Sequence, residues 1–460
     1  MKNSLFQEFE EVSAKQWKQK IQFDLKGADY NKELVYKSLD GINIKPFYNS
    51  EDIENHIRTP SPKNWNICER LYVISEQKVN KRALDVLQKG AESLWFIIPN
   101  EDISVKELFK GLPLEKTIIY LSFSFFSKNY FKRFREFFKE KDHQIFFQFD
   151  IVGNLARSGN WFHNLNKDHE IFDFIFDQSK EFESVVSIDA TLYQNAGATI
   201  PQQLAYSMAH VNEYLNHFQG TTNFEKFHPQ FLIASGSNYF FEIAKIRALR
   251  WLYGILAAEY KTLETCHILA QPTKRNKTLY DFNVNLLRTT TESMSAVLGG
   301  ADTVYNMPYD AIYHKNNIFG DRIARNQLLV LKHEAHLDKV SNAAEGAYYI
   351  ESLTKQFAES ALEIFKEIEK GGGFLKQLKE GIIQRKIKES AQKEQEHFDN
   401  GKIVLIGTNK FENPQDKMKE ELELYPFLKQ NPRKTLIEPI LEKRLSEQLE
   451  QIRLKQEKAD

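Results

Sequence analysis

The chain has 460 residues, of which 42% are hydrophobic and 13% aromatic, enough for one large domain with additional segments. Its 62 Lys and Arg residues and 63 Asp and Glu residues leave a net charge of −1, which argues against nucleic acid or an anionic membrane as a partner. No run approaches the roughly 18 uninterrupted apolar residues of a membrane-spanning helix.

The first 58 residues are expected to form an arm, because they contain too few apolar side chains for a core of their own. Their acidic start lacks the apolar region of a signal peptide. A helix is predicted around residues 13–23, with Ser13 as its N-cap and an end near Gly27, followed by an extended segment at 41–48. Such an arm must lie on the rest of the chain or on a partner.

Residues 59–400 alternate between short apolar runs and segments of helical periodicity. The runs are rich in β-branched and aromatic side chains, as strands buried on both faces are. They occupy residues 70–75, 93–99, 117–123, 144–151, 184–190, 230–235, 265–271 and, more weakly, 301–306. Eight such repeats favour a closed (β/α)8 TIM barrel over an open doubly wound sheet, so we expect an α/β fold.

Residues 401–460 are predicted to form a tail on the barrel. It should contain one more strand at 403–411, a Pro-punctuated stretch and a charged helix with Leu441, Leu445, Leu449 and Ile452 on one face. Before the tail, Gly371–Gly373 favours a turn between two helices over a phosphate cradle, because no strand precedes the glycines.

Few residues in the sequence suggest chemistry. Residues 185–198 are expected to run from a buried strand into a polar loop, where an α/β barrel keeps its active site, yet Gln194 and Asn195 titrate nowhere near neutral pH. His333 and His336 indicate an exposed helix end rather than a metal site. Cys68 and Cys266 are expected to be free, buried thiols in a reducing, cytoplasmic setting.

Two loops could hold an anion. Residues 235–238 close a strand and open a long helix, so their amides could bind an anion, or Ser237 or Asn238 could simply cap the helix. Arg157 is expected in a loop after the fourth strand, where it either contacts a phosphate or carboxylate or is merely exposed.

Seven stretches of the chain carry a family resemblance. They are GLPLEK (111–116), QNAGA (194–198), SNYFFEIAKIRALRWL (237–252), RTTTESMSAVLGGADTV (288–304), RIARNQ (322–327), GAYYIESLT (346–354) and VLIGTNKF (404–411). In this order they resemble the methylmalonyl-CoA mutase family, whose adenosylcobalamin enzymes rearrange the carbon skeleton of acyl-CoA esters. The resemblance covers nearly the whole chain and implies a (β/α)8 barrel.

The departures from the family pattern imply that the chemistry is lost. Where the family carries Tyr-His-Met-Gln-Glu-Ala-Gly, with its histidine against the thioester carbonyl, this chain has Leu192, which cannot donate a hydrogen bond. The family tyrosine beside the reacting carbon is absent from residues 59–70, and a Gly/Asp-rich loop shrinks to about 99–102. His267 aligns with a family arginine, and Ser122 begins the replacement of a Thr-Met-Asn triplet. We expect no catalytic residue, only degenerate barrel-mouth positions: Ser122, Arg157, Leu192, Gln194, His267 and Gln271.

The cobalamin-binding motif of the family is missing as well. None of the 12 histidines lies in an Asp-x-His-x-x-Gly run, and residues 443–455 resemble the linker that precedes such a domain in the family. We therefore expect no cofactor or metal on this chain, no cobalamin-binding domain after the tail, and adenosylcobalamin on a partner.

The resemblance implies a noncatalytic small subunit, paired in a heterodimer with a large subunit that interconverts succinyl-CoA and methylmalonyl-CoA. Its arm would wrap around the partner, and helices 238–260 and 281–298 are either interface elements or ordinary barrel helices. One alternative is the substrate-binding barrel of a split acyl-CoA mutase with cobalamin on a separate chain. Another is an unrelated barrel enzyme, which the weak mouth chemistry and the ordered motifs argue against.

Overall fold

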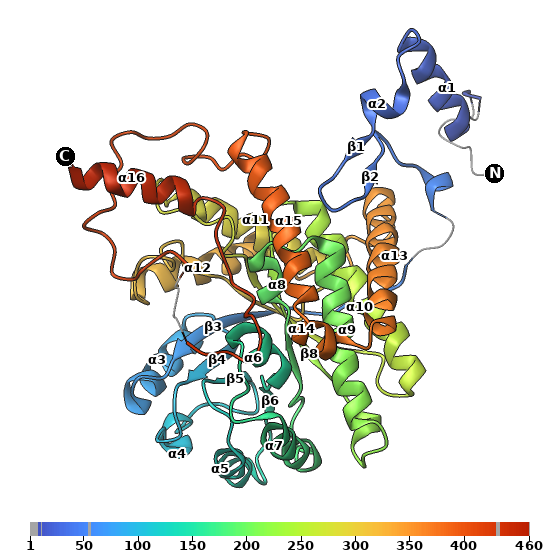
Figure 1. Ribbon diagram of the computed structural model, residues 1–460. Coiled ribbons are helices and arrows are strands. Elements are labelled where there is room, and N and C mark those ends of the chain that lie inside the picture. Colours follow the sequence, from blue (N-terminus) through green and yellow to red (C-terminus); the bar gives the residue numbers. More distant parts are fainter. Residues whose placement is uncertain (1–7, 11, 54–56, 429–432, 460) are drawn as a thin grey trace.

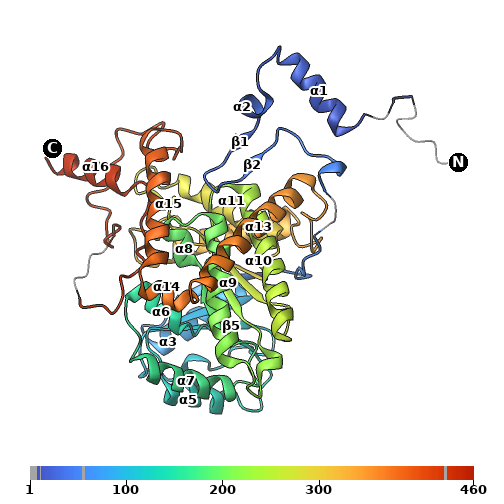
Figure 2. The same ribbon diagram turned by 45° about the vertical axis from the view of Figure 1, so that its right-hand side comes forward.

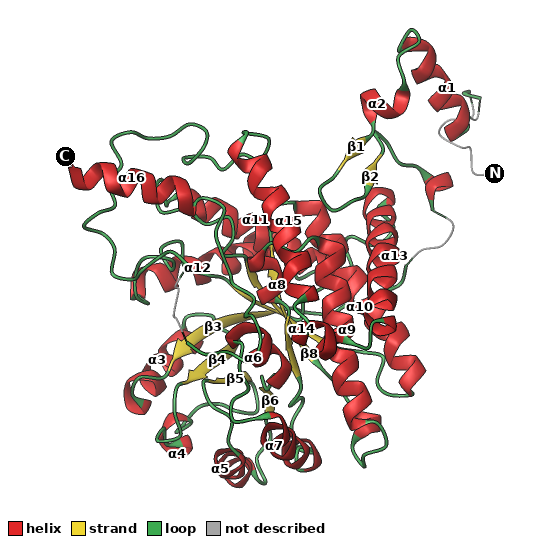
Figure 3. Ribbon diagram, in the orientation of Figure 1, coloured by secondary structure: helices red, strands yellow, loops and turns green. Residues whose placement is uncertain are grey.

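A computed structural model describes residues 8–10, 12–53, 57–428 and 433–459. Eight parallel strands form its centre, with helices around them and an arm that projects from one side (Figures 1 and 3). The strands are β3 (Asn66–Tyr72), β4 (Ser93–Ile98), β5 (Ile118–Phe123), β6 (Gln144–Phe147), β7 (Ser187–Asp189), β8 (Gln230–Ser235), β9 (His267–Pro272) and β10 (Thr303–Tyr305).

The eight strands close into a barrel. They pair in the order β6-β5-β4-β3-β10-β9-β8-β7, so β3 pairs with β10, the last strand in the sequence. The remaining seam between β6 and β7 is closed by a bridge between Phe146 and Ser184 and by the bond from the Phe147 amide to the Ser184 carbonyl at 2.8 Å. The prediction of a (β/α)8 TIM barrel is confirmed, and β10, predicted to be the weakest strand, has three residues.

The helices pack on the outside of the barrel. They are α3 (Glu76–Gln88), α4 (Val105–Leu108), α5 (Lys128–Phe138), α6 (Ile151–Ser158), α7 (Leu165–Asp177), α8 (Thr191–Ala196), α9 (Ile200–Phe218), α10 (Tyr239–Tyr260), α11 (Val284–Gly299), α12 (Ile318–Leu329), α13 (Tyr348–Lys370), α14 (Phe374–Lys379) and α15 (Ile382–Asp399). The predicted 238–260 helix is apolar on most faces because α10 packs against α9, α11 and α13. Both α10 and α11 therefore lie where barrel helices belong.

Two sequence predictions placed the wrong element at a strand end. The run 144–151 stops being a strand at Phe147, because Asp150 caps α6 by accepting a hydrogen bond from the Gly153 amide at 2.7 Å. The run after Asp189 is not a polar loop but the short helix α8, which ends at Gly197 with φ of 95°. Glycine suits that left-handed position, so it marks the end of a helix.

The interior of the barrel is filled. Inward side chains of seven strands form one buried apolar cluster: Cys68, Trp95, Tyr120, Phe146, Leu232, Leu269, Tyr305 and the following Met307. The Tyr120 hydroxyl lies 2.7 Å from His267 Nε2 and 2.6 Å from Thr303 Oγ1, so its polar end is also satisfied. The barrel axis is thus a packed core rather than a channel.

The N-terminal arm projects away from the barrel (Figures 1 and 2). It consists of α1 (Ala14–Asp24), α2 (Tyr30–Leu34) and a small hairpin of β1 (Tyr36–Lys37) and β2 (Asn43–Ile44), followed by a 3-10 turn at Ser50–Asp52. Ser13 caps α1 as predicted, accepting from the Gln16 amide at 3.2 Å. No residue of α1 is buried, and Phe23 is 78% exposed.

The tail differs from its prediction in two ways. Residues 403–411 form turns with a single bridge between Ile406 and Lys410, because no neighbouring strand is available and Asn409 satisfies the Leu405 amide. The final helix, α16 (Glu447–Ala459), begins after Leu441 and Leu445, so the expected four-residue apolar face does not exist. Leu445 is buried ahead of the helix, whereas Leu441, Leu449 and Ile452 are exposed.

Helix α16 instead docks through its carboxylates. Glu450, 1% exposed, accepts hydrogen bonds from the Leu279 amide and Ser446 Oγ, and it pairs with Arg444 at 2.6 Å. Such a buried ion pair holds the tail in one place on the barrel.

None of the helices that the structure describes combines the length and the apolar character needed to cross a lipid bilayer.

Candidate functional site

The mouth of the barrel, where the strands end at their carboxyl side, was expected to hold the site. Ser122, on β5, hydrogen-bonds there to two neutral side chains. Trp95 Nε1 donates to its hydroxyl at 2.8 Å, and the hydroxyl donates to Gln148. Gln271 lies on β9 beside Ala234 of β8. None of these groups can act as a general base at neutral pH.

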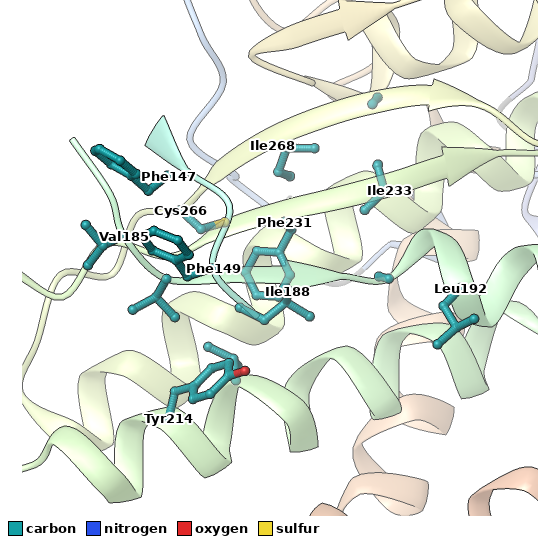
Figure 4. Packing of buried hydrophobic residues seen from close by; sticks show 14 of the residues in the cluster. Phe147, Phe149, Val185, Ile188, Leu192, Tyr214, Phe231, Ile233, Cys266 and Ile268 are labelled. Carbon is teal, nitrogen blue, oxygen red and sulfur yellow. The ribbon is translucent and has the colours of Figure 1, made fainter. Parts of the chain in front are cut away.

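Leu192 is buried in the apolar core of the protein. It is 1% exposed, and Figure 4 shows it on α8 in the same cluster as Ile188 and Ile233. A hydrocarbon side chain in such surroundings can neither polarise a carbonyl nor transfer a proton. The structure therefore gives Leu192 a packing role, with no donor at the position where the family pattern has its histidine.

The polar residues that follow Leu192 bind to the protein itself. Asn195 accepts from Thr273 Oγ1 at 2.8 Å and from the Lys274 amide at 3.0 Å, and its amide group donates to Glu442 of the tail at 2.9 Å. Gln194 lies beside Gly236, where an added Cβ would come within 2.8 Å of Gln194 Nε2. Residues 194–198 thus join α8 to the loop after β9 and to the tail.

Arg157 was predicted in a loop, but it lies in the last turn of α6. Its guanidinium pairs with the carboxylates of Asp189 at 2.6 Å and Glu442 at 3.2 Å. It is therefore neither an isolated exposed side chain nor an unpaired cation. Burial lowers the pKa of Arg157, but the two carboxylates raise it by more, so the pKa lies above its ordinary value. Burial raises the pKa of Glu442, but Arg157 and Lys274 outweigh it and hold that pKa at about 2.

His267 is brought inside the barrel, away from the mouth. Burial lowers its pKa to about 4, despite the opposing effect of Asp302, whose carboxylate lies 3.8 Å from Nδ1. Tyr120 hydrogen-bonds to the ring, whose centre lies 4.1 Å from that of the Phe146 ring at a tilt of 32°. A neutral imidazole in this setting is part of the core, not a catalytic group.

Acid should therefore destabilise the protein through His267. The unfolded chain binds a proton near the ordinary pKa of 6.5 and the folded chain only near 4, so stability falls as the pH drops between these values. We expect a loss of roughly 2–4 kcal/mol from this group. His228, whose pKa is also lowered, adds to it.

Urea unfolding at a series of pH values measures this loss. Replacing His267 with Gln should remove most of the slope contributed by that side chain, whereas His333→Gln, at an exposed position, should leave it unchanged. Equal slopes for the wild type and H267Q would contradict the assignment.

The residues that cover the mouth come from the tail, and no sequence pattern indicated them. Residues 436–445, the tail strap, cross the mouth and donate backbone hydrogen bonds from Leu436 to the Gly159 carbonyl and from Ile440 to that of Ala156. The strap then donates from Lys443 to Asn195 and from Leu445 to Arg275. The strap bonds to several separate helices and loops rather than to one neighbouring element. Its sequence therefore shows neither helical nor strand periodicity.

The other candidate motifs from the sequence lie apart from the barrel mouth or at helix ends. His333 and His336 are exposed, and the described residues contain no group of three or more His, Cys, Asp or Glu side chains placed for a metal ion. Asn238 precedes α10 without a side-chain capping bond, so side-chain capping, one of the two alternatives for residues 235–238, is not observed. Gly371–Gly373 forms the turn between α13 and α14, as predicted.

The residues that line the cavity at the mouth include no histidine that could ligate cobalt, and the tail strap and the loop at 424–428 lie over the strand ends. We therefore assign this chain no step that runs through the cofactor.

Fold and mouth together define an α/β barrel whose described mouth contains polar groups bound to one another and covered by its own tail. Residues 104–457 match the methylmalonyl-CoA mutase family, and the chain belongs to that family. The methylmalonyl-CoA mutase small subunit of Porphyromonas gingivalis is 33% identical over 452 residues, which cover 90% of this chain and 72% of that protein.

Two further relatives show how the similarity is distributed. The methylmalonyl-CoA mutase small subunit of Streptomyces virginiae is 26% identical over 445 residues, covering 89% of this chain and 72% of that one. Methylmalonyl-CoA mutase of Rhizobium meliloti is 34% identical over 249 residues, which cover 53% of this chain and 35% of that enzyme. The chain thus matches small subunits over most of its length and the enzyme from Rhizobium over about half of it.

Proposed function

We propose that this chain is the noncatalytic small subunit of a heterodimeric methylmalonyl-CoA mutase. Its large partner subunit binds adenosylcobalamin and interconverts succinyl-CoA and methylmalonyl-CoA. The observation that carries the proposal is the mouth: Leu192 is buried, Arg157 is neutralised by Asp189 and Glu442, and the tail strap lies across the strand ends. The printed names of two relatives, both small subunits of this enzyme, support it.

The arm supports the partner half of the proposal. Phe9, Trp17 and Phe23 are exposed, and the arm stands away from the barrel in both views (Figures 1 and 2). Apolar side chains gathered on a projecting segment are typical of a surface that another chain covers. The partner that fits is the large subunit, with the arm wrapped around it. Two unpaired, buried cysteines are in keeping with a cytoplasmic complex.

Coexpression with the large subunit from the same cells tests this function. A tagged copy should recover the large subunit in a one-to-one complex that has mutase activity with adenosylcobalamin, whereas the chain alone should have none. Leu192→His should not create activity in the isolated chain, because one donor does not rebuild a site. Activity of the chain alone would contradict the noncatalytic role, and a small cobalamin-only partner would favour the split enzyme.

A matched pair of variants tests the arm within the same experiment. Phe23→Glu places a charge on the exposed apolar surface and should weaken recovery of the large subunit at least about tenfold, as loss of an interface anchor does. Lys15→Glu, on the same helix and also exposed, should change it little. Equal recovery with both variants would remove the arm from the interface.

A further inference from the structure

A cavity remains under the tail strap at the barrel mouth. Its volume is about 510 Å³, within the range of small-molecule sites. Met307 and Ala311 from the barrel and Tyr425, Phe427 and Ile440 from the tail supply apolar walls. The barrel and the tail thus enclose a space of the size of a small metabolite.

Arg70 lies at the barrel side of this cavity. The guanidinium is 4.6 Å from the centre of the Tyr305 ring and 5.5 Å from that of Trp95, so two aromatic rings fix its position. Within the part of the chain that the structure describes, the guanidinium makes no hydrogen bond or ion pair with another residue. An arginine offers five N–H donors in a planar fork that matches carboxylate and phosphate groups.

The acids nearest to Arg70 are bound to other arginines. Glu69 pairs with Arg325 at 3.0 Å, and Asp321 accepts from Arg82. Both carboxylates are therefore already paired, and neither neutralises Arg70 through a direct contact.

Two carboxylates, Glu442 and Glu447, line the cavity, and Glu447 accepts from the backbone amides of Leu428 and Arg444. With the partners given below, the other charges around the cavity balance, so its positive excess comes from Arg70. Arg157, Arg275 and Arg444 each have a carboxylate partner from the chain itself. Lys274, half exposed, is 3.9 Å from the already shared Glu442, and Lys443 is exposed at the rim. A positive cavity with a fixed, unpartnered guanidinium and apolar walls selects for negative charge on an apolar body.

We propose that this cavity binds a small organic anion, whose carboxylate or phosphate group is held by Arg70 and whose apolar part lies against Met307 and the tail. The site does not depend on the noncatalytic role proposed above. Because the tail forms one wall, a bound anion also holds the tail against the barrel, and the ligand would stabilise whatever surface the tail presents.

Calorimetric titration of the full chain at low salt tests the site. Benzoate and phenyl phosphate are the probes, and neutral benzamide is the control for the apolar body. At least one anion should bind saturably in the millimolar range or tighter, and the tighter of the two identifies the carboxylate or the phosphate ester as the preferred group. Benzamide should not bind, because Arg70 recognises charge.

Variants locate the binding. Arg70→Gln should weaken it at least about tenfold and Arg70→Lys less, because lysine keeps the charge but loses the fork. Arg133→Gln, on α5 outside the cavity lining, should leave it unchanged. Thermal unfolding checks that the variants fold, and Lys274→Gln at the rim gives a second test if Arg70→Gln does not.

Hydrogen exchange separates this site from binding elsewhere. A bound anion should slow exchange in residues 424–428 and 440–444, which line the cavity, and not in the N-terminal arm. Saturable binding that survives Arg70→Gln, protection outside the tail only, or no binding of either anion would overturn the proposal.

Discussion

Replacing Lys277 with methionine should lower the free energy of unfolding by about 3–5 kcal/mol at neutral pH. Lys277 is 1% and Glu292 0% exposed in their side chains, and the ammonium lies 2.7 Å from the carboxylate. Burial lowers the pKa of Lys277 and raises that of Glu292, so each depends on the other to stay charged. Methionine would fill the space and leave a buried negative charge without its partner.

The double variant and the pH dependence identify the cause. Lys277→Met combined with Glu292→Leu should recover most of the stability, since a buried ion pair replaced by apolar residues costs little. In Lys277→Met alone, the Glu292 pKa would rise further above its unfolded value, so this variant should regain stability as the pH falls. Urea unfolding measures both effects. A loss below about 1 kcal/mol, or no gain toward acid, would mean that the pair contributes little.

Glu450→Leu should release the tail from the barrel. Leucine cannot accept the hydrogen bonds of the Leu279 amide and Ser446, and Arg444, 4% exposed, would lose its carboxylate. An unpaired buried charge costs about 3–5 kcal/mol. The chain can avoid that cost by undocking α16 and the strap, whereas the barrel core stays folded.

Limited proteolysis and hydrogen exchange measure this release. Cleavage and exchange should rise in residues 433–457 and remain unchanged in β4 and β5. Gln451→Leu, exposed on the same helix, is the matched control and should behave as the wild type. Global unfolding of Glu450→Leu, or an unchanged tail, would contradict the view of the tail as a separately released segment.

The strands were predictable because parallel strands buried on both faces are continuous apolar runs, and each of the eight runs overlaps a strand. Their ends were less so. Asp150 caps the start of α6, so Arg157, which was expected in a loop, lies in this helix. After β7, the chain forms the helix α8, which ends at Gly197, where the sequence suggested a loop.

The mouth was harder to predict than the strands. Its degenerate positions came from the family resemblance, but what satisfies them came from far along the chain. Glu442 contacts Arg157 and Asn195, which lie hundreds of residues earlier in the chain, and no periodicity of the sequence indicates these contacts. Likewise, the apolar face predicted for the tail helix was wrong, because α16 docks through the buried carboxylate of Glu450 and through Leu454, which was not among the four predicted residues.

The exposed arm also bears on how much of this protein a cell can make. Phe9 and Phe23 are 73% and 78% exposed, on a segment with no buried face of its own in α1. Copies made in excess over the protein that covers the arm would aggregate through these exposed rings. The aggregated fraction would grow with the concentration of the chain. With the pairing proposed above, balanced synthesis of the chain and its partner is a condition of solubility, and an unmatched copy is a natural substrate for proteolysis.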